Sequence, residues 1–262
     1  MIEYLSETPL KKPLIFDTHA HYDDERFSEI NEELFKELPL KGVGGIITCG
    51  CDLATSKKAL ELAEGYPFVF FAAGIHPGNI EDKGNLSEIE KLFSHKKCVA
   101  IGEIGLDYYW MQDNKNEQKE LFIKQLILSK EYNLPVLIHD RDAHADTLEI
   151  LKEYKPKGVV HSFSGSVKMA EELLKLGLYI GVGGVITSKN ARKLPDVVKM
   201  LPSDKILLET DAPYLAPVPY RSKTNNSAMI YLTAQKIAEL RQTTTENILQ
   251  TTFNNSKKLF NL

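Results

Sequence analysis

The sequence predicts an α/β fold, a (β/α)₈ TIM barrel made by a single domain over residues 1–262. Eight short apolar runs rich in β-branched residues alternate with longer segments of helical spacing. The length of 262 residues suits one such barrel, which typically takes about 250 residues. No linker or break in composition divides the chain, and no GxGxxG motif, the mark of a dinucleotide-binding open sheet, follows the first run.

Each predicted strand is an apolar segment of four to six residues, as is usual for strands buried in a parallel sheet. In chain order the predicted strands are Leu14–Thr18, Val43–Thr48, Phe68–Ala73, Cys98–Glu103, Pro135–His139, Gly158–His161, Leu178–Val182 and Lys205–Glu209.

Segments with helical spacing separate these strands. The clearest is Glu117–Tyr132, in which apolar residues form a stripe along one face. Further helices are expected after Asp52, Leu86, Asp142, Ser166 and Ser188. Residues that favour a helix N-cap stand at Asp52, Asn85, Asp142 and Ser166.

Two closing helices are expected after the eighth strand, over Ser227–Leu240 and Thr244–Phe260. The second opens with Thr243 or Thr244 and with Glu246, a pattern that resembles a capping box.

Composition limits the classes of function. A formal net charge of −4 argues against a broad basic surface for duplex nucleic acid, although a pocket for one strand end or a nucleotide stays open. Three cysteines are too few for a disulfide framework and indicate a reducing compartment. The N-terminal stretch MIEYLSETPLKKP lacks the apolar core of a signal peptide, and no apolar run approaches about 18 residues. We therefore expect a cytoplasmic protein without membrane partners, with a monomer as the default.

Histidines gather where the predicted strands end, which is where a TIM barrel carries its catalytic residues. His19 and His21 close the first strand and share one face of it, because side chains alternate along a strand. Five of the seven histidines stand at strand ends, namely His19, His21, His76, His139 and His161. As a set they predict a metal site.

Two carboxylates complete the candidate ligands. Glu103 ends the fourth strand and Asp211 follows the eighth. Mixed histidine and carboxylate ligands suit Zn²⁺, Mn²⁺, Fe²⁺ or Mg²⁺, so they do not select the metal. Four histidines and two carboxylates exceed one tetrahedral shell, which favours two divalent ions about 3.5–4 Å apart, with Glu103 able to bridge them. Asp211 can hold one ion and accept a proton from the attacking water, so the implied chemistry is hydrolysis.

The sequence resembles the TatD family of metal-dependent hydrolases and deoxyribonucleases, within the amidohydrolase-like superfamily. The similar stretches run in order from Leu14 to Tyr220 and cover most of the chain. They are DTHAHYDD, GIHP, IGEIGLDYY, PVLIHDRDA, HSFSG and LETDAPYLAPVPYR.

The resemblance implies a TIM barrel with a divalent metal centre. His19, His21, Glu103 and Asp211 would hold the first ion. Glu103, His139 and His161 would hold the second. His76 and Tyr108 would line the substrate pocket.

The sequence departs from the family pattern after Arg221. Members often continue with glycine, a basic residue and then Asn-Glu-Pro or a variant of it. Arg221 and Asn225 fit that pattern, whereas Ser222, Asn226 and Ser227 do not. The resemblance therefore does not extend to the contacts of this loop, which bear on substrate preference.

Several residues near the strand ends have two interpretations. Asp17 either orients a ligand histidine or accepts a backbone hydrogen bond. Glu209 needs a partner if it is buried, and support of a metal ligand is one hypothesis. Cys49 and Cys51 are expected to be small core residues rather than metal ligands.

Three residues are candidates for contacts with substrate. Arg141 either binds a phosphate oxygen or forms a salt bridge with Asp142 or Asp107. Arg221 lies in the loop after the eighth strand, where barrels often bind phosphate, and we expect it to contact phosphate. Trp110 either stacks on a base or packs on its own loop.

The favoured function is phosphodiester hydrolysis of DNA, at a strand end as by a 3′–5′ exonuclease, or of a small phosphate-containing substrate. The alternative is an amidohydrolase-type enzyme acting on a C–N or carboxylic ester bond. Many dinuclear members of that superfamily bridge their ions with a modified lysine, and here the position is Glu103. A metal-dependent binding protein without turnover is a third possibility.

Overall fold

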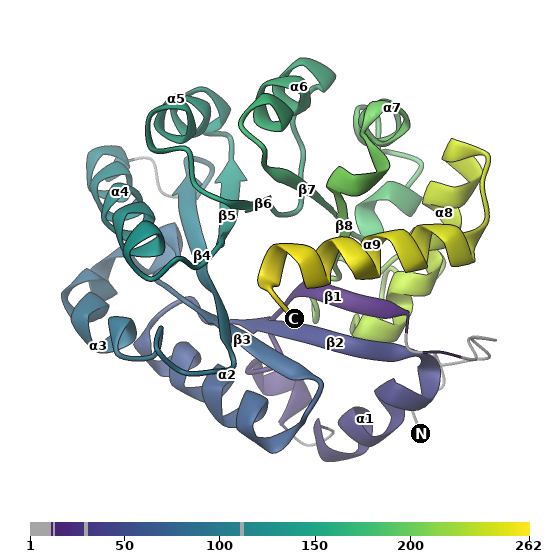
Figure 1. The fold of residues 1–262 in the computed structure, drawn as a ribbon, viewed down its shortest axis with the longest axis horizontal. Helices are drawn as coiled ribbons and strands as arrows, with labels where there is room; N and C mark the ends of the chain where they lie inside the picture. Colours follow the sequence, from purple (N-terminus) through teal and green to yellow (C-terminus); the bar gives the residue numbers. More distant parts are fainter. Residues whose placement is uncertain (1–11, 13, 29–30, 111–112) are drawn as a thin grey trace.

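The computed structural model describes residues 12, 14–28, 31–110 and 113–262. Eight parallel strands form one sheet in the order of the sequence, and helices surround it (Figure 1). The predicted (β/α)₈ barrel is confirmed. The described residues include no helix with the length and apolar character needed to cross a membrane. Most of the N-terminal stretch used in the signal-peptide prediction lies outside the described residues.

All eight predicted strands are present, with ends that differ from the predictions by up to four residues. The strands are β1 (Ile15–Ala20), β2 (Val43–Cys49), β3 (Val69–Ala73), β4 (Cys98–Asp107), β5 (Val136–Arg141), β6 (Gly158–Val160), β7 (Tyr179–Val182) and β8 (Ile206–Leu208). The α-helices in the described residues are α1 (Asn31–Glu37), α2 (Leu53–Gly65), α3 (Leu86–Glu90), α4 (Lys115–Glu131), α5 (His144–Tyr154), α6 (Val167–Lys175), α7 (Leu194–Met200), α8 (Ile230–Arg241) and α9 (Thr245–Phe260).

Three predicted helix caps are confirmed. The Asp52 side chain accepts a hydrogen bond from the backbone N–H of Thr55 and forms a capping box at the start of α2. Ser166 caps α6 in the same manner, and Thr244 caps α9 by accepting from the backbone of Asn247.

Three other expectations, which concern helix caps, are wrong. Asp142 has a left-handed φ of 54°, so α5 begins only at His144. Asn85 precedes α3 without a side-chain capping bond. Glu246 is the second residue of α9 rather than the third, so it cannot complete a capping box. The helix expected after Ser188 begins at Leu194.

Side chains of all eight strands meet inside the barrel. Leu137 of β5 and Val159 of β6 point inward, while their neighbours Ile138 and Val160 face the surrounding helices. The interior layer consists of Phe16, Ile47, Cys49, Ala72, Val99, Ala100, Leu137, Val159, Tyr179 and Leu207. This layer fills the barrel towards the N-terminal ends of the strands, which we call the lower end. The C-terminal ends of the same strands, at the upper end, can therefore carry polar side chains.

Helix α9 closes the lower end of the barrel. Its Phe260 is 3% exposed and packs against the interior layer. The Phe260 ring stacks on Phe16 at 6.4 Å between centroids, and Phe253 meets Phe16 edge-on at 5.9 Å. Figure 1 shows α9 crossing the barrel beside β1 and β8. The open end of the barrel is therefore the end at which the C-terminal ends of the strands lie.

The segment after β8 joins β1 and completes the barrel at that open end. The Asp211 N–H donates to the His19 carbonyl at 2.9 Å, and the His21 N–H donates to the Ala212 carbonyl at 2.6 Å. Ala20 and Ala212 form an isolated parallel bridge. Two histidines and the aspartate predicted to bind metal are thus fixed by the backbone bonds that close the sheet.

Gly105 lets β4 and β5 approach each other just above the site. It has a φ of +147°, and a Cβ there would overlap the carbonyl oxygen of His139. Gly177 also has positive φ, at +84°, but no atom would contact its Cβ.

Substitution of these two glycines distinguishes the cost of steric overlap from the cost of backbone strain. We expect Gly177→Ala to lower the free energy of unfolding by about 1–2 kcal/mol, since only backbone strain is added. Gly105→Ala should cost at least about twice as much, because β4 must also move away from β5. Urea unfolding followed by far-UV circular dichroism measures both, and equal losses would contradict the packing described.

Candidate metal centre

The structure brings all six predicted metal ligands together at the open end of the barrel. Five of them line a cavity of about 710 Å³, and the sixth, His19, lies fully buried beneath it. The six residues are His19, His21, Glu103, His139, His161 and Asp211. They come from five different strands or strand ends, so the folded barrel is required to assemble them.

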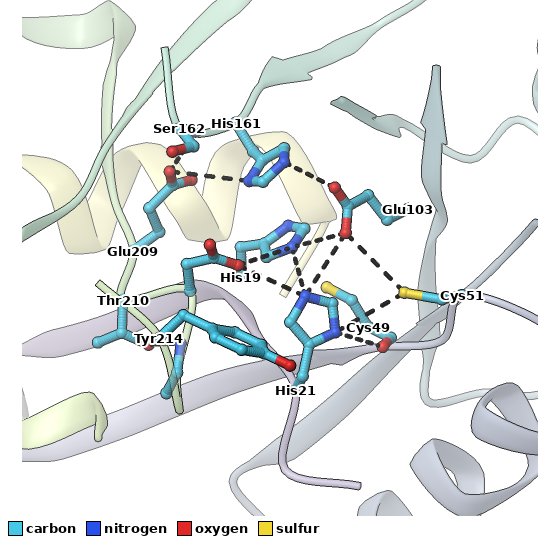
Figure 2. A network of polar contacts seen from close by, with 12 residues as sticks. His19, His21, Cys49, Cys51, Glu103, His161, Ser162, Glu209, Thr210 and Tyr214 are labelled. Atoms are coloured by element: carbon cyan, nitrogen blue, oxygen red, sulfur yellow. Dashed lines mark hydrogen bonds and ion pairs between the residues drawn. The ribbon is translucent and has the colours of Figure 1, made fainter. Parts of the chain in front are cut away.

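Glu103 contacts four histidines of this group, and Figure 2 shows one of its carboxylate oxygens facing His161 and the other facing His19 and His21. Oε2 lies 3.2 Å from His19 Nε2 and 3.5 Å from His21 Nε2. Oε1 lies 2.7 Å from both His139 Nδ1 and His161 Nε2. One buried carboxylate therefore separates two pairs of imidazoles.

The first pair forms a group with Asp211. His19 Nε2 and His21 Nε2 are 3.2 Å apart, and Asp211 Oδ1 lies 3.8 Å and 3.5 Å from them. With Oε2 of Glu103, two imidazole nitrogens and two carboxylate oxygens converge on one point. This donor set fits a divalent metal ion.

The second pair shares Oε1 of Glu103. His139 Nδ1 and His161 Nε2 are 3.3 Å apart. His76 Nε2 approaches the same oxygen at 3.6 Å, and His76 also lines the cavity, as predicted. His76, Glu103 and His139 therefore form a further group with ligand-like spacing.

Burial keeps two of these imidazoles, His19 and His76, neutral. Burial, followed by the neighbouring His161, lowers the pKa of His19 to about 4. The two rings stack with centroids 3.9 Å apart, an arrangement that disfavours two positive charges. Burial likewise lowers the pKa of His76 to about 3. A neutral imidazole is the form that binds a metal ion.

The register of the strands decides which side chains reach the site. On β5 and β6 the ligands follow simple alternation, with His139 two residues after Leu137 and His161 two residues after Val159. On β1 the spacing is three, from Phe16 to His19, and the pairing with β2 shifts between Asp17 and Ala20.

Strand β4 contains a similar irregularity. Ile101 and Ile104 both face the helices although they are three residues apart, and the pairing with β5 shifts between them. Glu103 lies inside this shift and turns into the barrel. Irregularities of this kind commonly re-aim side chains beside functional sites.

Asp107 is a supporting residue that the sequence-based ligand assignment missed. Its Oδ2 lies 3.1 Å from His139 Nε2, so it fixes the ring whose Nδ1 faces Glu103. Its Oδ1 accepts the backbone N–H groups of Tyr109 and Trp110 at 2.9 Å and 3.0 Å. A carboxylate behind a metal-binding histidine is a frequent arrangement. The sequence signal that could have identified Asp107 is its position at the C-terminal end of β4.

Asp17 and Glu209 support the backbone around the site. Asp17 accepts hydrogen bonds from the N–H of Thr210 at 3.0 Å and from the Thr210 and Ser227 hydroxyls at 2.6 and 2.7 Å. Glu209 accepts from the N–H of Ser162, and its Oε1 lies 4.0 Å from His161 Nδ1. Of the interpretations considered for Asp17, backbone support therefore agrees with the structure, and Glu209 lies beside a candidate ligand.

The predicted substrate-binding residues separate into two groups. His76 and Arg141 line the cavity. Tyr108 and Arg221 do not: the Tyr108 hydroxyl donates to Asp146 at 2.7 Å, and Arg221 Nη1 lies 3.5 Å from the carbonyl of Ala216. Contact of these two residues with substrate stays a prediction that the geometry does not support.

The two cysteines at the end of β2 differ. Cys49 is buried in the interior layer, as expected. Cys51 instead lines the cavity, with Sγ 3.9 Å from His21 Nδ1 and 4.0 Å from Glu103 Oε2. The expectation that Cys51 is a core residue is therefore wrong, because the chain leaves β2 at Cys49 and turns over the barrel mouth.

Comparison with known proteins places this site in context. Residues 16–261 match the family described as TatD related DNase. An uncharacterized metal-dependent hydrolase of Bacillus subtilis, YabD, is 42% identical over 95% of this chain and 100% of its own length. The Escherichia coli hydrolase YcfH, described in the same words, is 36% identical over 95% of this chain and 96% of its own.

Solved structures agree with the sequence comparisons. The crystal structure of YjjV, a TatD homologue from Escherichia coli, has a TM-score of 0.90 at 35% identity and covers 95% of this chain and 99% of its own. A TatD-family hydrolase from Entamoeba histolytica has a TM-score of 0.86 at 25% identity and covers 95% of this chain and 99% of its own.

The role of Asp107 can be tested through metal affinity. We expect Asp107→Asn to weaken binding of Mn²⁺ at the His139 group by about 10–100-fold, because His139 loses the charge that orients its ring. Isothermal titration calorimetry measures the affinity. Asp140→Asn is the matched control, since Asp140 binds His144 and Thr147 rather than a candidate ligand. Wild-type affinity in Asp107→Asn would contradict the assignment.

Proposed function

The chain belongs to the TatD family of metal-dependent hydrolases, and from this premise we propose that it hydrolyses phosphodiester bonds of DNA at a strand end, using two divalent metal ions. Zn²⁺, Mg²⁺ and Mn²⁺ all suit the ligand set. The same chemistry would apply to a small phosphodiester substrate.

The orientation of Glu103 is the observation that carries the proposal. Its Oε2 faces His19 and His21, while Oε1 faces His139 and His161. One ion would be held by His19, His21, Glu103 and Asp211, and the other by Glu103, His139 and His161. A carboxylate with one oxygen for each ion is the arrangement expected of a dinuclear centre.

The charge of the cavity also supports metal-assisted binding of an anion. Six carboxylates and one arginine are found among its lining residues, namely Asp23, Asp24, Glu103, Asp107, Asp140, Asp211 and Arg141. On its own this surface would repel a phosphodiester. Two divalent cations would offset most of the negative charge.

When bound, the ions would polarise a phosphoryl oxygen and lower the pKa of water towards about 7. Asp211 is placed to accept the proton of the attacking water. Its side chain is 19% exposed towards the cavity, compared with 4% for Glu103. Burial opposes ionisation of Asp211, but the hydrogen bond from His21 and the charge of His161 lower its pKa to about 2. The carboxylate is therefore ionised at neutral pH and available as a base.

Arg141 supplies a positive side chain at the cavity. It lines the cavity without an ion pair to any residue in the described part of the chain. Its guanidinium can therefore donate two parallel hydrogen bonds to a phosphate oxygen pair of the substrate. His76 stands next to Glu103 and is in reach of the same phosphate.

Hydrolysis of DNA can be tested directly. The metal-loaded protein is incubated with end-labelled single-stranded oligonucleotide and with Mg²⁺, Mn²⁺, Co²⁺ or Zn²⁺, and products are resolved by electrophoresis. Progressive shortening from one end supports the proposal. No cleavage with any of the four metals would overturn it, and hydrolysis of amide or lactone substrates instead would favour the C–N or carboxylic ester alternative.

Removal of the proposed base should slow the chemical step. We expect Asp211→Asn to lower kcat on the oligonucleotide by at least about 10²-fold, since general base catalysis contributes about that much. Asp204→Asn, at an exposed position just before β8, should keep the wild-type rate. Equal rates in Asp211→Asn and wild type would exclude Asp211 as the base.

The second ion depends on the two histidines that face Oε1 of Glu103. We expect His139→Ala and His161→Ala each to lower the metal content from two ions per chain towards one, because each removes one of three proposed ligands. Elemental analysis of dialysed protein measures this content. The Asp140→Asn control should retain two ions, and an unchanged content in both histidine variants would contradict the assignment.

A further inference from the structure

A second cavity, which we call the side pocket, adjoins the main cavity. It has a volume of about 320 Å³ and is lined by residues that follow β6 and by residues between β7 and α7. Ser162 and Ser164 line both cavities, and Ser162 directly follows the candidate ligand His161. A group bound in the side pocket would therefore be a neighbour of a group bound at the metal centre.

The late start of α7 provides one wall of the side pocket. A helix is expected after Ser188, but α7 begins at Leu194. The preceding residues, 190–193, are not helical and line the side pocket instead. Two of them, Arg192 and Lys193, are basic.

The side pocket and the main cavity differ in charge. Arg192 and Lys193 are the charged residues that line the side pocket, and no carboxylate from the described ranges lines it. The main cavity is lined by six carboxylates and one arginine. An anion would therefore need metal ions to enter the main cavity, whereas the side pocket would attract it directly.

Both basic side chains are available to a ligand. Neither Arg192 nor Lys193 forms an ion pair with another residue in the part of the chain that the structure describes. The next carboxylate along the chain, Asp196, pairs instead with Lys199 at 3.6 Å. The Arg192 guanidinium can donate two parallel hydrogen bonds to a phosphate group, and the Lys193 ammonium can add a compact positive charge.

Neutral groups complete the lining. The side chains of Ser162, Ser164 and Asn190 can donate hydrogen bonds to an anion in the side pocket. The buried side chains of Phe163 and Leu194 add apolar surface, which suits the carbon atoms of an attached sugar. The side pocket therefore combines the features needed for a phosphorylated organic group.

We propose that the side pocket binds a terminal phosphomonoester of the substrate, while the metal centre hydrolyses the adjoining phosphodiester. A phosphomonoester carries a charge of about −1.5 to −2 at pH 7, which matches the two basic side chains. A phosphodiester carries a single negative charge and would leave one of them unmatched. This inference rests on the proposed phosphodiester hydrolysis and names its substrate more closely, as a nucleotide strand with a phosphorylated end.

Binding can be measured without cleavage by using thymidine dinucleotides whose internal linkage is a nuclease-resistant phosphorothioate. One probe carries a 5′ phosphate and another a 3′ phosphate, because the geometry does not choose between the two ends. An unphosphorylated tetranucleotide has about the same charge in three diester linkages. With metal-loaded protein, we expect isothermal titration calorimetry to show about 5–50-fold tighter binding of one phosphorylated dinucleotide than of the tetranucleotide.

Substitutions assign this preference to the side pocket. Arg192→Gln and Lys193→Gln should each reduce it to within about twofold, because each removes one of the two positive charges. Lys189→Gln is the matched control, since Lys189 is an exposed lysine of the same loop that lines neither cavity, and it should keep the preference. The preference should also persist after dialysis against EDTA, because none of the six candidate metal ligands lines the side pocket.

The outcomes distinguish the side pocket from the proposed activity. Equal affinity for the phosphorylated dinucleotides and the tetranucleotide would overturn the side pocket alone, even if oligonucleotides are cleaved. The same conclusion would follow if the preference survived in both Arg192→Gln and Lys193→Gln, or vanished in metal-free protein with an unchanged circular dichroism spectrum. A preference lost in these two variants, without cleavage of any oligonucleotide, would support the side pocket and contradict the proposed hydrolysis.

Discussion

The carboxylate of Glu103 is the group around which the upper barrel is arranged. Four imidazole nitrogens lie within 3.5 Å of its two oxygens, yet the side chain is only 4% exposed. A buried charge of this kind is costly unless cations or hydrogen-bond donors surround it. The irregular register of β4, which turns Glu103 inward, and the close approach at Gly105 are therefore conditions for the site as well as features of the fold.

The same carboxylate links the site to the closure of the barrel. His19 and His21 face Oε2 of Glu103, and their backbones pair with Asp211 and Ala212 beyond β8. The backbone pairing that closes the sheet therefore positions three candidate ligands, His19, His21 and Asp211. On the opposite side, Asp107 holds His139 behind Oε1 and holds the backbone of Tyr109 and Trp110 beside the cavity.

Much of this arrangement could be predicted from the sequence, for physical reasons. Parallel strands buried on both faces give continuous apolar runs, so all eight strands were found. Simple alternation then carries His139 and His161 to the interior face, two residues after Leu137 and Val159. The hydrophobic periodicity does not encode the register shifts in β1 and β4. The inward orientation of His19 and Glu103 could therefore be predicted only because histidines and carboxylates gather at the strand ends. The positions of loop residues such as Cys51, Tyr108 and Arg221 could not be predicted from periodicity, because they depend on turns that no repeating pattern specifies.

Both proposed metal ions depend on Glu103, with one ion at each carboxylate oxygen. Crystals grown with Mn²⁺ and measured at the manganese absorption edge would test this most directly. We expect two anomalous peaks about 3.5–4 Å apart, one between Glu103 Oε2 and the pair His19 and His21, the other between Oε1 and the pair His139 and His161. A single peak at full manganese saturation, or two peaks on the same oxygen, would contradict it.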